Sequence, residues 1–221
     1  MAAYVGLLRS QARPRGLIGF PPEALGEQLA RSLMLLEALG RPERLVDVGS
    51  GAGLPGIPLM IALGNGVLVE PRRKAAAFLE GVIRHLDLPG RVEVATAEEA
   101  GRGRLRDWAD AVVARAVGAP ALAAELCAPL CAPGGIVVLT AAPDATRRDL
   151  PEEVRAALGL GDVEIRTVQA RLEDATADAG VIVAQRLLMM RKVAPTPDEL
   201  PRRPGTARRR PLGRDVRSWS P

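Results

Sequence analysis

Aromatic residues, histidine and cysteine are scarce in this chain. It has two Phe, two Trp and one Tyr among 221 residues, so Ala, Leu and Val must build the hydrophobic core. So few rings argue against a base-stacking cage of aromatic side chains. One His and two Cys are too few for a zinc site of the usual kind, so we expect no metal and interpret Cys127 and Cys131 as buried thiols.

Long apolar runs and a signal sequence are also missing. No stretch of about eighteen apolar residues lacks a charge, which argues against a transmembrane helix. The segment Met1 to Arg9 has no basic start before a long apolar stretch, so we predict no signal peptide and expect a cytoplasmic, monomeric protein without membrane contact. The length and the hydrophobic content of 48% suit one domain with additional terminal segments.

Acidic residues are rare at the C-terminal end. From 186 to 221 there are ten Arg or Lys against three Asp or Glu, whereas residues 1–185 carry twenty against twenty-three. This basic tail predicts a phosphate-rich partner, although a solvated and partly disordered end is the alternative. The arginines that we predict to bind RNA phosphates are Arg202, Arg203, Arg208, Arg209 and Arg210.

Strand and helix signals alternate along the middle of the chain. Strands are predicted at 44–48, 67–70, 91–96, 110–114 and 136–140, and helices at 25–40, 57–63, 74–86, 120–131 and 146–158. Residues 1–20 are expected to be loosely ordered. The alternation predicts an α/β fold with a mostly parallel sheet that is covered on both faces.

Two longer β-rich segments, around 163–172 and 180–193, end this pattern. The short polar link between them permits a hairpin but not a crossover, so these two strands should be antiparallel. We therefore predict a Rossmann-like, seven-stranded sheet with an antiparallel C-terminal hairpin. The predicted divisions are an N-terminal extension and helix at 1–40, a domain at 41–193 and a basic, proline-rich tail at 194–221.

The segment Asp47 to Gly56, DVGSGAGLPG, follows the first predicted strand and has two interpretations. It satisfies G-x-G-x-x-G with Glu70 about twenty residues later, as in a dinucleotide site. It also resembles an S-adenosylmethionine cradle, in which an acid precedes alternating glycines. Asp47 favours the second interpretation, because a carboxylate repels a pyrophosphate but attracts a sulfonium and an amino group. In both, Glu70 accepts hydrogen bonds from ribose hydroxyls.

Several motifs together make a more specific resemblance. They are DVGSGAGLPGIP at 47–58, LVEP at 68–71, AEE at 97–99, ARA at 114–116 and the ending KVAPTP at 192–197 with PRRPGT at 201–206. Over about 17–212 the chain resembles the bacterial 16S ribosomal RNA guanine-N7 methyltransferases, also called the glucose-inhibited division protein B family. The resemblance implies a class I methyltransferase fold and a domain of that kind at 41–193, with S-adenosyl-L-methionine as cofactor.

The resemblance also implies site residues and a substrate. The implied partner is 16S ribosomal RNA or the small ribosomal subunit, and Arg115 is the implied catalytic residue. Guanine N7 has a lone pair and no proton, so the reaction needs no general base, and the lack of a suitable base is no objection. The residues implied to bind the cofactor are Asp47, Gly49, Gly51, Gly53, Leu54, Glu70, Ala97, Glu98 and Arg115.

Two segments depart from the family pattern. Residues 28–33 read QLARSL where the family has H-L-L-D-S-L, and residues 139–141 read LTA where it has L-K-G. Both are expected near the RNA, so they bear on target choice more than on cofactor binding. The alternatives are a methyltransferase for another RNA or a small molecule, and a non-enzymatic RNA-binding protein with a vestigial cofactor pocket.

Overall fold

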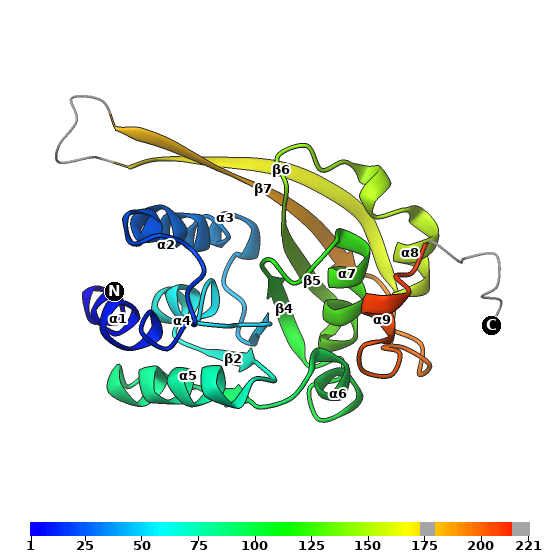
Figure 1. The fold of residues 1–221 in the computed structure, drawn as a ribbon. Coiled ribbons are helices and arrows are strands. Elements are labelled where there is room, and N and C mark those ends of the chain that lie inside the picture. Colours follow the sequence, from blue (N-terminus) through cyan, green and yellow to red (C-terminus); the bar gives the residue numbers. More distant parts are fainter. Residues whose placement is uncertain (173–179, 214–221) are drawn as a thin grey trace.

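A seven-stranded sheet forms the centre of the computed structural model, which describes residues 1–172 and 180–213 (Figure 1). Its order is β3-β2-β1-β4-β5-β7-β6. The first five strands pair in parallel, and β7 pairs antiparallel with both β5 and β6, which confirms the predicted sheet. The strands are β1 (Leu45–Val48), β2 (Gly66–Val69), β3 (Gly90–Glu93), β4 (Ala109–Ala114), β5 (Cys131–Ala141), β6 (Leu160–Leu172) and β7 (Val181–Lys192).

Helices cover both faces of the sheet. One face packs against the N-terminal helices and the other against those that follow β3, while β6 and β7 extend as a long pair past α2 and α3 (Figure 1). No helix in the described part of the chain is long and apolar enough to cross a membrane. The helices are α1 (Ala2–Leu7), α2 (Leu25–Leu33), α3 (Leu36–Leu39), α4 (Gly56–Leu63), α5 (Arg73–His85), α6 (Ala97–Arg102), α7 (Pro120–Cys127), α8 (Glu152–Ala157) and α9 (Thr206–Arg209).

Alternation along the buried strands assigns each side chain to one face. On β4, Val112 packs with the α6 and α7 cluster, whereas its neighbour Val113 packs with the cluster that includes α3. Successive residues of a strand point to opposite faces, so a strand covered on both sides is apolar throughout. All four residues of β1 are buried, and Asp47 is therefore a carboxylate inside the core.

The expectation of a loosely ordered N-terminus is wrong. Residues 2–12 form α1 and one following π-helical turn, and Tyr4, Leu8 and Ala12 have no exposed surface. They pack in a cluster with the glycine loop and α5. The Arg, Gly and Pro residues that suggested disorder lie mainly after this helix, and tertiary burial orders the segment before them.

Some predicted boundaries move. The helix predicted at 25–40 is divided into α2 and α3, and the helix predicted to reach Cys131 ends as α7 with a short 3-10 turn, so that Cys131 begins β5. The strand β5 is longer than predicted because it begins at Cys131, which pairs with Ala109 of β4. The link predicted at 173–179 and the tail residues 214–221 lie outside the described residues.

Candidate active site

The glycine loop joins the end of β1 to α4. Gly49, Gly51 and Gly53 have positive φ angles of 72°, 58° and 95°, which L side chains rarely adopt. A Cβ on Gly53 would lie 2.5 Å from Ile57 Cγ1, so packing within the protein requires a glycine there. A Cβ on Gly51 would lie 3.7 Å from the Arg72 guanidinium, an ordinary contact distance, so the positive φ angle rather than a lack of space favours glycine there.

Asp47 lies beneath the loop. Its side chain is buried, Oδ2 accepts a hydrogen bond from the Gly56 N–H at 3.1 Å, and Oδ1 has no partner among the described residues. Burial raises the pKa of Asp47 to about 6, although the charge of Arg115 and the Gly56 N–H partly oppose this shift. Asp47 thus positions the loop and places a negative charge under it, and direct contact with a cofactor stays a prediction.

Glu70 also braces the loop. One of its carboxylate oxygens accepts from the Gly51 N–H at 2.8 Å, and the other accepts from the backbone and side chain of Arg72 at 2.9 Å. Burial raises the pKa of Glu70, but the hydrogen bonds from Arg72 and Gly51 outweigh it, so the net pKa is lowered. The carboxylate is at the strand end where the sequence places it, and the ribose contact stays a prediction.

A cavity of about 230 Å³ lies beside this loop. Val69, Ala97, Val117 and Leu122 contribute apolar groups to its lining, and Thr96 and Glu98 contribute polar ones. Glu98 is buried, and one of its oxygens accepts from the Gly205 N–H at 2.9 Å. An apolar slot with a few placed polar groups is typical of small-molecule sites. The cavity, the loop backbone at Gly49 and the carboxylate of Glu98 fit the purine end of a nucleoside cofactor.

Leu54, which the resemblance also assigns to the cofactor, packs in the core with Tyr4 and α5. The Tyr4 hydroxyl donates to the Ala52 carbonyl at 2.7 Å, so α1 is tied directly to the glycine loop. Burial raises the pKa of Tyr4, the charge of Arg115 opposes that shift, and the hydroxyl stays protonated as a donor. Leu54 therefore supports the loop from within the core, and its cofactor contact stays a prediction.

Arg115 follows β4 directly and is held by α2. Its Nη1 donates to the Gln28 carbonyl at 3.2 Å and to the Ser32 hydroxyl at 3.4 Å. Burial lowers the pKa of Arg115, while the charge of Asp47 opposes that change. The guanidinium makes no other hydrogen bond to the described residues, and it lines a second cavity. Its remaining donors are therefore available to a ligand in that cavity.

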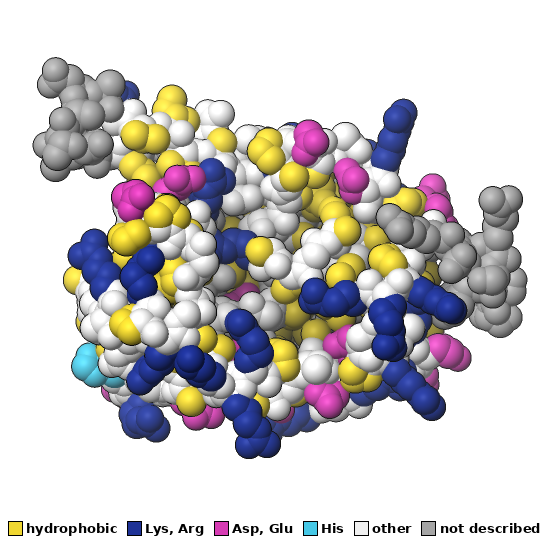
Figure 2. All heavy atoms as spheres, viewed as in Figure 1, with side chains coloured by type: hydrophobic (Ala, Val, Ile, Leu, Met, Phe, Trp, Pro, Cys, Tyr) yellow, Lys and Arg dark blue, Asp and Glu magenta, His cyan; other side chains and the backbone are white. Residues whose placement is uncertain are grey.

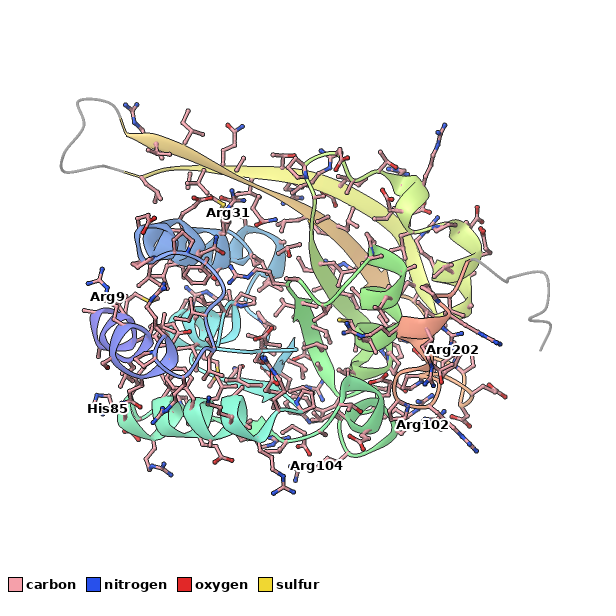
Figure 3. All side chains as sticks on the ribbon, viewed as in Figure 1. Arg9, Arg31, His85, Arg102, Arg104 and Arg202 are labelled. Atoms are coloured by element: carbon pink, nitrogen blue, oxygen red, sulfur yellow. The ribbon has the colours of Figure 1, made fainter. Side chains whose placement is uncertain are left out.

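The second cavity is larger, about 770 Å³, and its lining has more arginines than carboxylates, which are Asp144 and Asp149. Three arginines contribute to it, Arg31, Arg115 and Arg148, together with Thr140 and Gln185. The two segments that depart from the family pattern thus meet at one place. Figure 2 shows a recess on this face with Lys and Arg side chains around it, and Figure 3 shows that Arg31 projects from α2 near this recess.

The tail arginines do not form one surface. Arg202 makes a bidentate ion pair with Glu125, whose side chain has no exposed surface, at 2.7 and 2.5 Å. Arg208 lines the smaller cavity. The remaining predicted residues, Arg203, Arg209 and Arg210, are exposed. Figure 3 shows Arg102 and Arg202 at the same end of the molecule, beside the chain that follows β7.

Sequence reasoning missed several residues of this region. Tyr4 is the single tyrosine of a chain poor in aromatic residues, and that rarity was an available signal. Glu125 is a lone acid in an apolar helix, a pattern that indicates a buried charge with a partner elsewhere. Val117 and Gly205 line the smaller cavity without any comparable signal, because only tertiary structure brings them there.

Comparisons with known proteins identify the family of this chain. The sequence model of the family described as "GidB: rRNA small subunit methyltransferase G" matches residues 1–156. The chain belongs to this family. Ribosomal RNA small subunit methyltransferase G of Rubrobacter xylanophilus is 38% identical over 194 residues, which cover 82% of this chain and 69% of that protein. The protein of the same name from Lacticaseibacillus paracasei is 34% identical over 96% of this chain and 89% of its own length.

Solved structures share the fold at low sequence identity. The tRNA (m1A58) methyltransferase TrmI of Aquifex aeolicus has a TM-score of 0.57 and 15% identity, over 74% of this chain and 68% of that chain. TYW2 of M. jannaschii, solved in complex with AdoMet, has a TM-score of 0.56 and 17% identity, over 80% and 79% of the two chains. The family and the class I methyltransferase fold predicted from the sequence are confirmed.

Proposed function

We propose that this protein transfers a methyl group from S-adenosyl-L-methionine to N7 of a guanine in 16S ribosomal RNA. Membership of the family supports the enzyme class, the cofactor and the RNA. The observation that carries the proposal for this chain is the pair of cavities on either side of residues 115–119. Val117 lines the smaller cavity, and Arg115, Ala116 and Gly118 line the larger one. A donor and an acceptor bound in these cavities meet across one short loop.

The smaller cavity holds the nucleoside end of the cofactor. Gly49 brings the backbone of the loop to this cavity, Glu98 accepts from the purine edge and Glu70, at the end of the neighbouring strand β2, accepts from ribose hydroxyls. Asp47 supplies the negative charge that favours a cationic ligand over a pyrophosphate. When bound, S-adenosylmethionine supplies an electrophilic methyl group on a positively charged sulfur.

The larger cavity holds the target guanine. A cofactor held in the smaller cavity would supply its methyl group to the N7 lone pair, and its sulfur would keep the electron pair of the carbon–sulfur bond. No proton moves, so the residues around the base act by orientation and electrostatics. Arg115 positions the base through guanidinium donors that α2 leaves free, and the buried charge of Asp47 offsets the positive charge that the guanine gains.

The RNA backbone binds through arginines that line the larger cavity and through exposed arginines of the C-terminal segment. Arg31 and Arg148 line the larger cavity, and the exposed Arg203, Arg209 and Arg210 add positive charge on the C-terminal segment. Arginine contacts to phosphate fix the position of an RNA strand without reading its bases. Association should therefore weaken steeply as salt concentration rises.

Methyl transfer to ribosomal RNA lacking the modification tests the proposal. Purified protein is incubated with labelled cofactor and either deproteinised 16S RNA or assembled small subunits from a deletion strain, and digested nucleosides are identified by mass spectrometry. We expect labelled N7-methylguanine at one position, loss of most transfer with Arg115→Ala, and normal transfer with the control Arg84→Ala, which removes an exposed arginine of α5. An unchanged methylation map in the deletion strain contradicts the proposal.

A further inference from the structure

The chain after β7 is a docked arm. We call residues 193–213 the C-terminal arm. Its first residues bond to the end of α8: the N–H groups of Val193 and Ala194 both donate to the Gly159 carbonyl. The buried Lys192 donates to the Leu158 carbonyl at 2.9 Å and also to the Thr196 hydroxyl. The first residues of the arm are therefore anchored to the domain.

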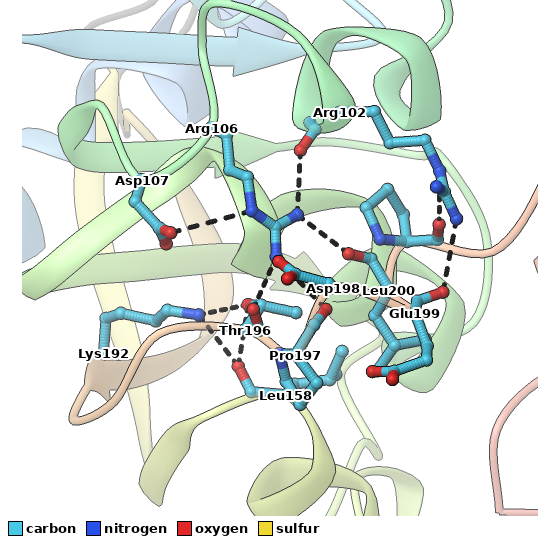
Figure 4. Close-up of polar contacts among 12 residues, drawn as sticks. Arg102, Arg106, Asp107, Leu158, Lys192, Thr196, Pro197, Asp198, Glu199 and Leu200 are labelled. Carbon is cyan, nitrogen blue, oxygen red and sulfur yellow. Dashed lines mark hydrogen bonds and ion pairs between the residues drawn. The ribbon is translucent and has the colours of Figure 1, made fainter.

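Two arginines of the α6 region hold the middle of the arm (Figure 4). Arg106 donates to the carbonyls of Thr196, Pro197 and Leu200 at 2.5, 3.1 and 2.9 Å. Arg102 donates to the carbonyls of Glu199 and Pro201 at 3.3 and 2.9 Å. An extended segment with many prolines has few partners for its own carbonyls, and these guanidinium groups satisfy them.

Two buried carboxylates fix the end of the arm over the smaller cavity. Glu125 of α7 pairs with Arg202, and Glu98 of α6 accepts from the Gly205 N–H. Ala207, on the following turn α9, has no exposed surface and packs with α7. This docking is unlike a solvated basic tail, because its contacts are specific and several are inaccessible to water.

The docking brings Gly205 and Arg208 into the wall of the smaller cavity. Among the described residues that line this cavity, Arg208 is the only cationic one. Arg208 makes no ion pair or hydrogen bond to the described residues, although its neighbour Ala207 is buried and Gly205 is bonded to Glu98. The rest of the wall is apolar except for Thr96 and Glu98. A planar guanidinium at the edge of an apolar slot is suited to stack on an aromatic ring.

We propose that the C-terminal arm forms the outer wall of the cofactor pocket and that Arg208 contacts the purine of the cofactor. This inference rests on the proposed function, since it takes the ligand of the smaller cavity to be a nucleoside. The proposal gives the arginines of the basic tail different roles. Arg202 holds the arm through Glu125, Arg208 serves the cofactor, and Arg209, its neighbour, stays outside the cavity and available to RNA.

Calorimetric titration with S-adenosylhomocysteine tests the proposal on the full chain. A cation stacked on a ring contributes about 1 kcal/mol, so Arg208→Ala should weaken binding about three- to tenfold. Arg209→Ala is the matched control, because it removes the same charge from the next position without touching the cavity, and its affinity should equal that of the wild type. Both residues are exposed, so neither substitution removes a core contact.

Proteolysis gives a second measurement that does not depend on activity. Saturating S-adenosylhomocysteine should slow trypsin cleavage after Arg208 and Arg209 in the wild type, because a ligand that binds the docked arm stabilises it. Equal affinity of Arg208→Ala and the wild type, or equal losses in both variants, would overturn the proposal while leaving the proposed function intact. Absence of binding by the wild type would overturn both.

Discussion

Replacing Asp47 by Asn should make the protein more stable and bind its cofactor less well. Asp47 is 1% exposed, and only one of its oxygens has a partner among the described residues. Burial raises its pKa from 3.8 to about 6, a shift of roughly two units, which corresponds to about 3 kcal/mol. That free energy is the cost of holding the carboxylate ionised in the core at neutral pH. A neutral Asn side chain avoids this cost.

The sign of the effect depends on pH. Between about pH 4 and pH 6 the unfolded chain loses the Asp47 proton while the folded chain keeps it, so this group lowers the free energy of unfolding as pH rises. Below pH 4 Asp47→Asn and the wild type should have similar stability. Above pH 7 the variant should be more stable by up to about 3 kcal/mol, with no further change.

Urea denaturation at a series of pH values, without cofactor, measures this difference. Asp110→Asn is a control of opposite sign, since the hydrogen bond from Arg44 lowers the pKa of Asp110. Its removal should cost stability that grows as pH rises toward about 4 and stays constant above that pH. Calorimetry should show S-adenosyl-L-methionine binding to Asp47→Asn about tenfold more weakly, a loss of about 1.4 kcal/mol. A pH-independent difference in stability, or lower stability at every pH, would refute the reasoning.

Three other substitutions test the contacts around the site. Tyr4→Phe leaves the buried Ala52 carbonyl without its donor, so urea unfolding should show a loss of about 1–3 kcal/mol, and the KM for the cofactor should rise more than kcat falls. Arg202→Ala leaves Glu125 as an unpaired buried charge and should cost about 3–5 kcal/mol in thermal unfolding, whereas Arg203→Ala should change stability by less than about 0.5 kcal/mol. Burial lowers the pKa of Lys192 to about 8. The free energy of unfolding of the wild type should therefore rise relative to that of Lys192→Met as pH rises from 8 to 10.5. A difference that does not change with pH would contradict this assignment.

Much of the fold was predictable because its signals are local. Apolar strands alternating with amphipathic helices indicate a parallel sheet, and a link of a few residues between two strands permits only a hairpin. The glycine loop was equally visible, since an acid and three alternating glycines at a strand end have few structural explanations. These patterns depend on residues close together in the chain, and the structure reproduces them with shifts of a few residues at the boundaries.

The order of the N-terminus and the ion pairs of the C-terminal arm could not be predicted from the sequence for a common reason. Each segment lacks periodicity of its own and is ordered by a partner far away in sequence. Tyr4 bonds to the glycine loop 48 residues later, and Arg202 pairs with Glu125 across 77 residues. Composition correctly shows that the tail is basic, but it does not show which of its charges are already paired.

By itself the sequence determined the family, the parallel sheet with its terminal hairpin and the loop that admits a cofactor, because these follow from local spacing and residue type. Only the tertiary structure decided the environment of each charge. It buried Asp47 under the loop, paired Arg202 with Glu125 and set Arg208 at the cavity. The free energy of a charge depends on its solvent exposure and its neighbours, and these are fixed only when distant segments pack together.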